Sequence, residues 1–143
     1  MSESGYAVEP IGIVPLGVVR SALTRPEGAP RQGDEGGPEA WLELAPAVAE
    51  GLGGIAAGDE LLVLTWLHLA RRDVLQVHPR GNREAPLTGV FATRSQDRPN
   101  PVGLHQVTVL EVAPHRLRVA PLEAIDGTPV IDIKPVLGHP ETR

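Results

Sequence analysis

The chain has 143 residues, of which 41% are hydrophobic, and it contains no cysteine. This length and composition predict one folded domain with a sizeable core. The lack of cysteine excludes disulfides, thiolate metal sites and cysteine nucleophiles. The first residues, MSESGYAVEP, are polar and acidic, unlike a signal peptide, and no apolar run reaches the roughly 18 residues of a membrane span. We therefore expect a cytoplasmic protein without a membrane partner.

The net charge of −5 is unevenly distributed along the chain. Residues 1–60 hold ten acidic residues and three arginines, whereas residues 61–143 hold eight acidic and ten basic residues. Six arginines gather between positions 71 and 98: Arg71, Arg72, Arg80, Arg83, Arg94 and Arg98. This pattern fits either a solvated face of mixed charge or a local basic surface that faces an anionic substrate.

In chain order, short segments with the composition of strands are separated by glycine and proline. They are residues 14–21, 40–44, 60–68, 73–78, 88–92, 102–112, 116–120 and 129–133. In RLRVA (116–120), Leu117 and Val119 alternate with arginines, which is typical of a half-buried strand. Only residues 46–52 look helical. Because no strand–helix–strand alternation is present, we predict an all-β fold, a small antiparallel β-barrel with short helical turns.

This barrel domain is expected to span residues 14–137. Residues 1–13 then form an N-terminal extension and residues 138–143 a C-terminal tail. Residues 25–38, RPEGAPRQGDEGGP, read as a long loop, and loops of this length are usually functional or mobile.

The sequence does not support three common kinds of functional site. Residues 50–56, EGLGGIA, contain G-x-G-x-x-A, but no strand precedes this stretch and no helix follows it, so a dinucleotide site is not expected. The five histidines show no metal-ligand spacing, and we predict no metal site. A G-x-S-x-G elbow for serine-hydrolase chemistry is also missing.

The stretch RSQDRPNPVG (94–103) is more specific. Pro99 and Pro101 favour extended conformations at residues 98 and 100, so the loop is expected to be stiff, and Gly103 lets the backbone approach a ligand. Further on, DGTP (126–129) offers a turn with a carboxylate and a hydroxyl. Taken singly, each piece is typical of a well-made turn.

Taken together and in this order, APRQG, GVFATRSQDRPNPVGL and IDGTPVIDIKP resemble the TsaA-like family, whose best-known members are the TrmO tRNA methyltransferases. The resemblance covers roughly residues 14–137. It implies a small β-barrel that forms a homodimer and binds S-adenosylmethionine without a Rossmann domain. It also implies an enzyme that methylates N6 of threonylcarbamoyl-adenosine beside the anticodon, with tRNA as its partner.

The same resemblance implies a set of cofactor-binding residues: Pro30, Arg31, Gln32, Leu67, His68, Arg94, Leu104, Ala124, Ile125, Asp126, Gly127 and Thr128. Within this set, Arg94 or Arg31 could pair with the carboxylate of the cofactor's methionine end. Backbone groups around Leu104 and residues 124–127 could read the adenine edge. Asp126 is the candidate catalytic residue, which could bond ribose or orient the incoming amine, or could instead only shape its turn.

Several positions depart from the family's usual pattern. His105 stands where a serine follows GL, Glu123 and Ala124 replace an aspartate and a leucine before IDGTP, and Val136 replaces a tyrosine. Aromatic residues make up only 3% of the chain, so platforms for stacking bases are scarce. These departures favour a first alternative, a divergent methyltransferase that acts on a small-molecule or peptide amine. A non-catalytic S-adenosylmethionine-binding module is a second alternative.

Overall fold

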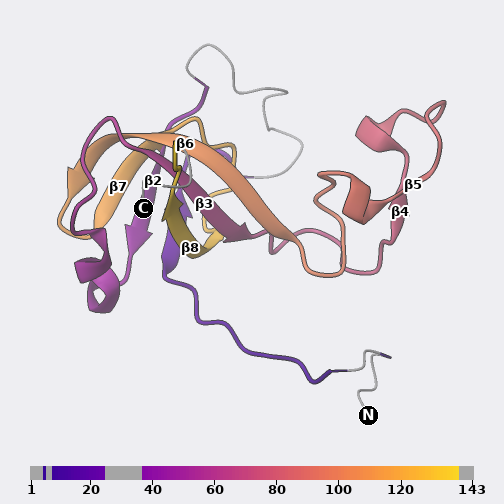
Figure 1. Cartoon of the computed structure of the whole chain (residues 1–143), viewed down its shortest axis with the longest axis horizontal. Helices are drawn as coiled ribbons and strands as arrows, with labels where there is room; N and C mark the ends of the chain where they lie inside the picture. Colours follow the sequence, from indigo (N-terminus) through magenta and orange to yellow (C-terminus); the bar gives the residue numbers. More distant parts are fainter. Residues whose placement is uncertain (1–4, 6–7, 25–36, 139–143) are drawn as a thin grey trace.

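The computed structural model describes residue 5 and residues 8–24 and 37–138. Its body is a closed barrel of six strands in the order β1-β2-β7-β6-β3-β8, and each strand runs antiparallel to its neighbours (Figure 1). The strands are β1 (Gly17–Arg20), β2 (Ala40–Leu44), β3 (Glu60–Trp66), β6 (Val102–Ala113), β7 (Arg116–Ala120) and β8 (Pro129–Pro135). The predicted all-β barrel is confirmed, and β2 and β7 have the predicted bounds.

The core of the barrel follows from alternating side chains. In β2, Ala40, Leu42 and Leu44 are buried and the residues between them are not, which is the expected pattern for a strand with one face on a core. The inward residues of the six strands, with Leu52 and the segment before β8, form one cluster: Val19, Ala40, Leu42, Leu44, Leu52, Leu61, Val63, Val107, Val109, Leu117, Val119, Leu122, Ala124 and Val130. Because the barrel is closed, each of its six strands pairs with a neighbour on both sides.

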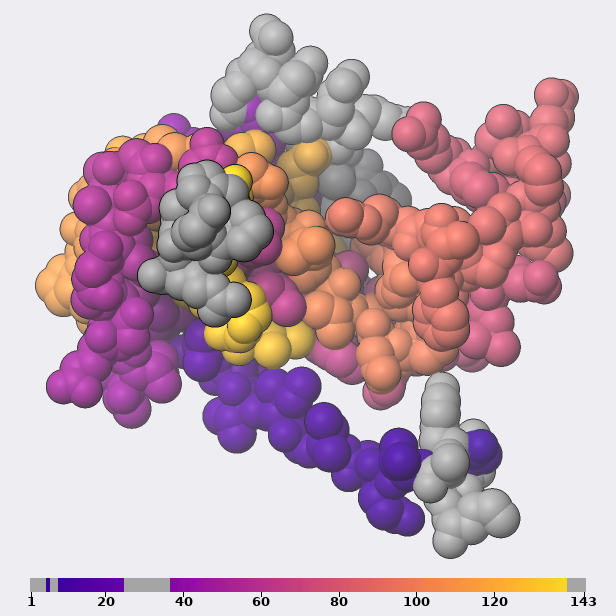
Figure 2. All heavy atoms as spheres, in the orientation of Figure 1, coloured from indigo at the N-terminus to yellow at the C-terminus, as the bar shows by residue number. Residues whose placement is uncertain are grey.

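Between β3 and β6 the chain leaves the barrel and forms a small lobe, here called the β4–β5 lobe (residues 69–92). It contains β4 (Gln76–Val77) paired with β5 (Thr88–Gly89), and the short 3-10 helices η3 (Pro79–Gly81) and η4 (Val90–Ala92). Figures 1 and 2 show the lobe, in pink, standing out from the barrel. Four of the six clustered arginines, Arg71, Arg72, Arg80 and Arg83, belong to it.

Some predicted strands are shorter in the structure. The segment 14–21 contributes only Gly17–Arg20, and residues 8–16 run as an extended segment beside the body (Figure 2). Leu16 still bonds Val130 and Ala45, but Pro15 before it has no N–H to donate to a ladder and Val14 is 85% exposed, so the pairing ends there. The segment 60–68 forms a strand only to Trp66. The Leu67 amide still bonds the Pro101 carbonyl at 2.8 Å, and the chain then turns, with the Ala70 amide bonded to the Leu67 carbonyl at 3.0 Å.

The predicted strands of the lobe are largely wrong. Only Gln76–Val77 of the segment 73–78 is a strand, and segment 88–92 divides into β5 and η4. Of the residues in these two segments only Val90 is buried, and it lies outside the core cluster of the barrel, so β-favouring composition alone does not set the backbone. Residues 46–52 are helical as predicted and form the 3-10 helix η2 (Pro46–Leu52). Within the described ranges, no helix is long and apolar enough to cross a membrane.

Candidate functional site

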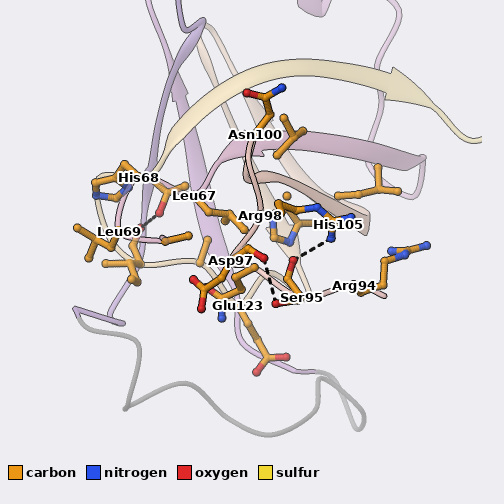
Figure 3. Close-up of a pocket in the computed structure, with 18 of the residues that line it drawn as sticks. Leu67, His68, Leu69, Arg94, Ser95, Asp97, Arg98, Asn100, His105 and Glu123 are labelled. Atoms are coloured by element: carbon orange, nitrogen blue, oxygen red, sulfur yellow. Dashed lines mark hydrogen bonds between the residues drawn. The ribbon is translucent and has the colours of Figure 1, made fainter. Parts of the chain in front are cut away.

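A pocket of about 800 Å³ lies where one end of the barrel meets the segments that lead into and out of the β4–β5 lobe. Four separate parts of the chain form most of its lining: the turn after β3, the segment from Phe91 to Asn100, the first residues of β6, and the segment before β8. In Figure 3, His68 and Leu69 lie on one side of the view and Arg94 on the other, with Asp97, Arg98 and Glu123 between them. Its size is in the range of small-molecule sites.

One wall of the pocket is the proline loop, defined as residues 93–101. The Arg98 guanidinium donates to three backbone carbonyls that surround it, those of Val90 (2.8 Å), Thr93 (3.1 Å) and Ser95 (2.8 Å). Its own amide donates to the Arg71 carbonyl at 3.0 Å. Arg98 therefore holds the loop together, and both of its terminal nitrogens donate within the protein.

The lobe braces the same loop from outside. Arg72 donates from Nε to the Pro99 carbonyl (2.7 Å) and from Nη2 to Asn100 Oδ1 (2.9 Å), and its guanidinium stacks 5.1 Å from the centre of the Trp66 ring. The Arg71 amide donates to Asp97 Oδ1 at 2.9 Å. The stiffness that the two prolines predict is thus completed by arginines from the preceding segment.

Arg94 differs from these arginines. It is exposed, it lines the pocket, and among the described residues its guanidinium has neither a hydrogen-bond nor an ion-pair partner. A planar guanidinium of this kind is suited to bind a ligand carboxylate through two parallel hydrogen bonds.

The end of the barrel supplies the floor of the pocket. His105 Nε2 lies 2.9 Å from Oγ1 of Thr65, a fully buried residue of β3. Burial lowers the pKa of His105 below its ordinary value, so the ring is neutral at physiological pH. Gly103, two residues before His105 on β6, has no side chain at the point where Thr65 and His105 meet. A Cβ there would collide with Thr65 Oγ1 and come within 2.9 Å of His105 Nε2.

Glu123, in the segment before β8, also lines the pocket. Its Oε2 atom is buried and has no hydrogen-bond partner among the residues that the structure describes. The backbone on either side is fixed, because the Leu122 amide bonds the Pro38 carbonyl (2.9 Å) and the Ala124 carbonyl accepts from Ser21 Oγ (2.7 Å). An unpartnered carboxylate oxygen is therefore held at the pocket wall.

The DGTP turn is arranged differently from the rest of the site. Asp126 Oδ1 accepts from the Ser21 amide at 3.0 Å, and Oδ2 lies 3.8 Å from Arg20 Nη1. Gly127 has a φ of 90° and its amide bonds the Val19 carbonyl. Asp126 lines a second, smaller hollow beside β1 and β2 instead of the main pocket, and its side-chain contacts tie the turn to the end of β1. A catalytic role for Asp126 stays a prediction.

The pocket brings together seven residues of the predicted cofactor set: Leu67, His68, Arg94, Leu104, Ala124, Ile125 and Thr128. It does not include Asp126 or Gly127 in its lining. Pro30, Arg31 and Gln32 lie outside the described residues. Gly103, which the sequence predicted to lie close to a ligand, is part of the lining. Sequence reasoning missed the pocket position of Phe91, and took Glu123 and His105 only as departures from a family pattern. For Phe91 the sequence held one signal, because it is the single phenylalanine of the chain.

Within the described part of the chain, no group of three His, Asp or Glu residues is placed to hold a metal ion. The pocket therefore offers a cation at Arg94, a neutral imidazole at His105, a carboxylate at Glu123, and apolar surface at Leu67, Leu104 and Phe91. This combination can bind a ligand that carries a carboxylate, hydrogen-bond donors and an apolar or aromatic body.

Comparisons with known proteins converge on one family. Residues 18–140 match the model of the tRNA-methyltransferase O N-terminal domain, TrmO_N. A probable S-adenosyl-L-methionine-binding protein of Methanothermobacter thermautotrophicus is 47% identical over 125 residues, which are 87% of this chain and 89% of the relative. An S-adenosyl-L-methionine-binding protein of Archaeoglobus fulgidus is 45% identical over 120 residues, with 84% and 85% covered.

Among solved structures, the crystal structure of TrmO from Pseudomonas aeruginosa is similar with a TM-score of 0.73 at 29% identity. The match covers 90% of this chain but 57% of that TrmO chain, so this chain spans little more than half of its length.

Proposed function

We propose that this chain, which belongs to the tRNA-methyltransferase O N-terminal domain family, is an S-adenosylmethionine-dependent methyltransferase that modifies N6 of threonylcarbamoyl-adenosine beside the tRNA anticodon. One observation carries the cofactor part of the proposal. Seven residues that the family resemblance assigns to the cofactor come from four segments far apart in sequence, yet all line one pocket. The names of the Methanothermobacter and Archaeoglobus relatives support the same ligand.

The chemistry of the pocket fits this cofactor. Arg94 would pair with the carboxylate of the methionine end, because its guanidinium has no partner among the described residues. Leu67, Leu104 and Phe91 offer apolar surface for the nucleoside, and the missing side chain at Gly103 lets Thr65 and His105 pack closely at the floor. The Ala124–Ile125 backbone would read the adenine edge.

S-adenosylmethionine, when bound, supplies an electrophilic methyl group on a cationic sulfur. The residues of this chain have to align that group with the acceptor nitrogen and exclude water, and alignment is the main requirement of an in-line displacement. The proline loop suits this task because Arg72 and Arg98 fix its backbone. The acceptor nitrogen also loses a proton, which a carboxylate, a neutral histidine or solvent can accept.

Two features of the β4–β5 lobe support tRNA as the partner. Arg80 and Arg83 are exposed and have no ion-pair partner among the described residues, and Arg94 opens into the nearby pocket. Cationic side chains on a projecting lobe are suited to phosphate contacts beside a bound nucleotide. The homodimer that the resemblance implies belongs to this proposal as well, and sedimentation velocity tests it.

The test is methyl transfer to purified tRNA, followed by mass analysis of the released nucleosides. We expect methylated threonylcarbamoyl-adenosine with tRNA that carries this modification, and no product with tRNA that carries unmodified adenosine there. Absence of product with a protein that binds S-adenosylmethionine would contradict the tRNA substrate.

A small-molecule or peptide amine is the second candidate acceptor. The net charge of −5 and the aromatic content of 3% favour it, because both are unfavourable for holding a flipped base on a polyanion. Methylation of a small amine by this chain, without product on tRNA, would support this candidate. Cofactor binding without turnover on any acceptor would support the non-catalytic module.

A further inference from the structure

Two buried side-chain atoms have no hydrogen-bond partner in the described ranges, His115 Nδ1 and Glu123 Oε2. They differ in position. His115 lies in the turn between β6 and β7 and is not part of the pocket, whereas Glu123 lines the pocket and is labelled among its side chains in Figure 3. A ligand in the pocket can therefore donate a hydrogen bond to Glu123 Oε2, whereas His115 Nδ1 lies outside the pocket lining.

The arrangement of Glu123 is costly for the free protein. A buried carboxylate oxygen without a donor has lost its water and gained nothing in exchange. The carboxylate cannot readily turn away with its backbone, because Leu122 and Ala124 are buried and their backbone groups are bonded to Pro38 and Ser21. Buried polar groups in native proteins are almost always partnered, so this exception indicates a partner that binds from the pocket.

We propose that Glu123 Oε2 accepts a hydrogen bond from a sugar hydroxyl of the bound ligand. This inference rests on the proposed function, because the nucleoside of S-adenosylmethionine and the target nucleoside of tRNA both carry ribose hydroxyls. A hydroxyl donor is favoured over an ammonium group. Burying a second charge adds a large desolvation cost, whereas a hydroxyl forms a charge-assisted bond at a much smaller one. The cofactor set implied by the family resemblance does not include Glu123.

The experiment compares the full chain with Glu123→Met, which keeps the length of the side chain and removes its oxygens. Binding of S-adenosylhomocysteine and of 5′-methylthioadenosine is measured by calorimetry. The second probe keeps the ribose and lacks the amino-acid end. His115→Phe is the matched control, because it removes the other unpartnered atom away from the pocket, and both affinities should stay unchanged in it.

Weakening of both probes by about tenfold or more in Glu123→Met supports a contact to the cofactor's ribose. Unchanged affinity for both probes with a raised KM for tRNA supports a contact to the acceptor's ribose. Weakening of S-adenosylhomocysteine alone overturns the hydroxyl assignment in favour of the ammonium group. Unchanged affinity and unchanged KM overturn the proposal altogether.

Thermal stability separates a binding role from a structural one. Because Glu123→Met removes an unpartnered buried oxygen, the melting temperature without ligand should be equal or higher. A melting temperature lower by more than about 3 °C would mean that the carboxylate stabilises the fold, and would overturn the proposal. Glu123→Gln keeps one acceptor oxygen without the charge, so its affinity should fall between those of the parent and Glu123→Met. If the parent itself bound neither probe, the proposed function would fail, whatever Glu123 does.

Discussion

The barrel and the proline loop meet at the same pocket but are stabilised by different interactions. The barrel has a ladder of backbone hydrogen bonds on every strand and a continuous apolar core. The loop has no comparable core, and guanidinium groups that donate to its carbonyls hold it in place. The floor of the site therefore depends on apolar packing and one wall depends on arginines.

This difference explains how the loop can present a free cation to a ligand. Of its two arginines, Arg98 is used to fix the backbone, whereas Arg94 has no partner among the described residues and lines the pocket. A rigid backbone allows one guanidinium to be held toward a ligand without a large loss of chain entropy on binding.

The largest effect is expected in the barrel. Leu117 is fully buried, so Leu117→Ala should lower the free energy of unfolding by about 2–5 kcal/mol through lost burial and a residual cavity. Urea denaturation measures it. Leu75→Ala, on the lobe and 64% exposed, is the matched control and should change stability by no more than about 0.5 kcal/mol. Equal losses in the two variants would show that the lobe shares the packing of the barrel.

The stability of the proline loop should depend on Arg98 and not on Arg94. Arg98→Gln leaves the carbonyls of Val90, Thr93 and Ser95 without their donor, which should cost about 1–3 kcal/mol. Amide hydrogen exchange should become faster in residues 93–101 and stay slow in the barrel strands. Arg94→Gln should leave stability and exchange as in the parent. Fast exchange in both variants would remove the distinction between the two arginines.

The packing of the pocket floor should be sensitive to added volume. In Gly103→Ala the new methyl group would collide with Thr65 Oγ1 and crowd His105, so we expect a loss of about 1–3 kcal/mol in unfolding experiments. Gly51→Ala, where a Cβ meets nothing within 4 Å, is the control and should lie within about 0.5 kcal/mol of the parent. A fully stable Gly103→Ala protein would mean that the floor can rearrange freely.

The smallest effect is a pH dependence of stability at the floor. Because burial lowers the pKa of His105 in the folded protein, the unfolded chain takes up its proton first as pH falls. The contribution of His105 is therefore favourable above the unfolded pKa, and stability decreases as pH falls through and below that value. In His105→Ser this part of the decrease should disappear, measured as the difference in melting temperature between about pH 7.5 and about pH 5.5. An identical pH dependence in both proteins would contradict the burial effect.

The barrel could be predicted from sequence because periodic apolar residues such as Leu42, Leu117 and Val119 record which face is buried. The lobe could not be predicted as well, since the residues of η4 have strand-like composition without a sheet to join. Most of the pocket was implied by motifs. The position of Asp126 was not, because its bond to the Ser21 amide joins residues 105 positions apart and leaves no local pattern. The hydrogen bond from Arg72 to Asn100 joins residues 28 positions apart and likewise leaves no local pattern.

The measurement that bears most directly on the site is calorimetric titration of the chain and of Arg94→Ala with S-adenosylhomocysteine. Binding to the parent, weakened about tenfold or more in Arg94→Ala at unchanged melting temperature, is the expected result, because one charge-assisted hydrogen-bond pair is lost from an already folded pocket. Absence of binding to the parent, or equal affinity of the two proteins, would contradict the assignment of this pocket to the cofactor.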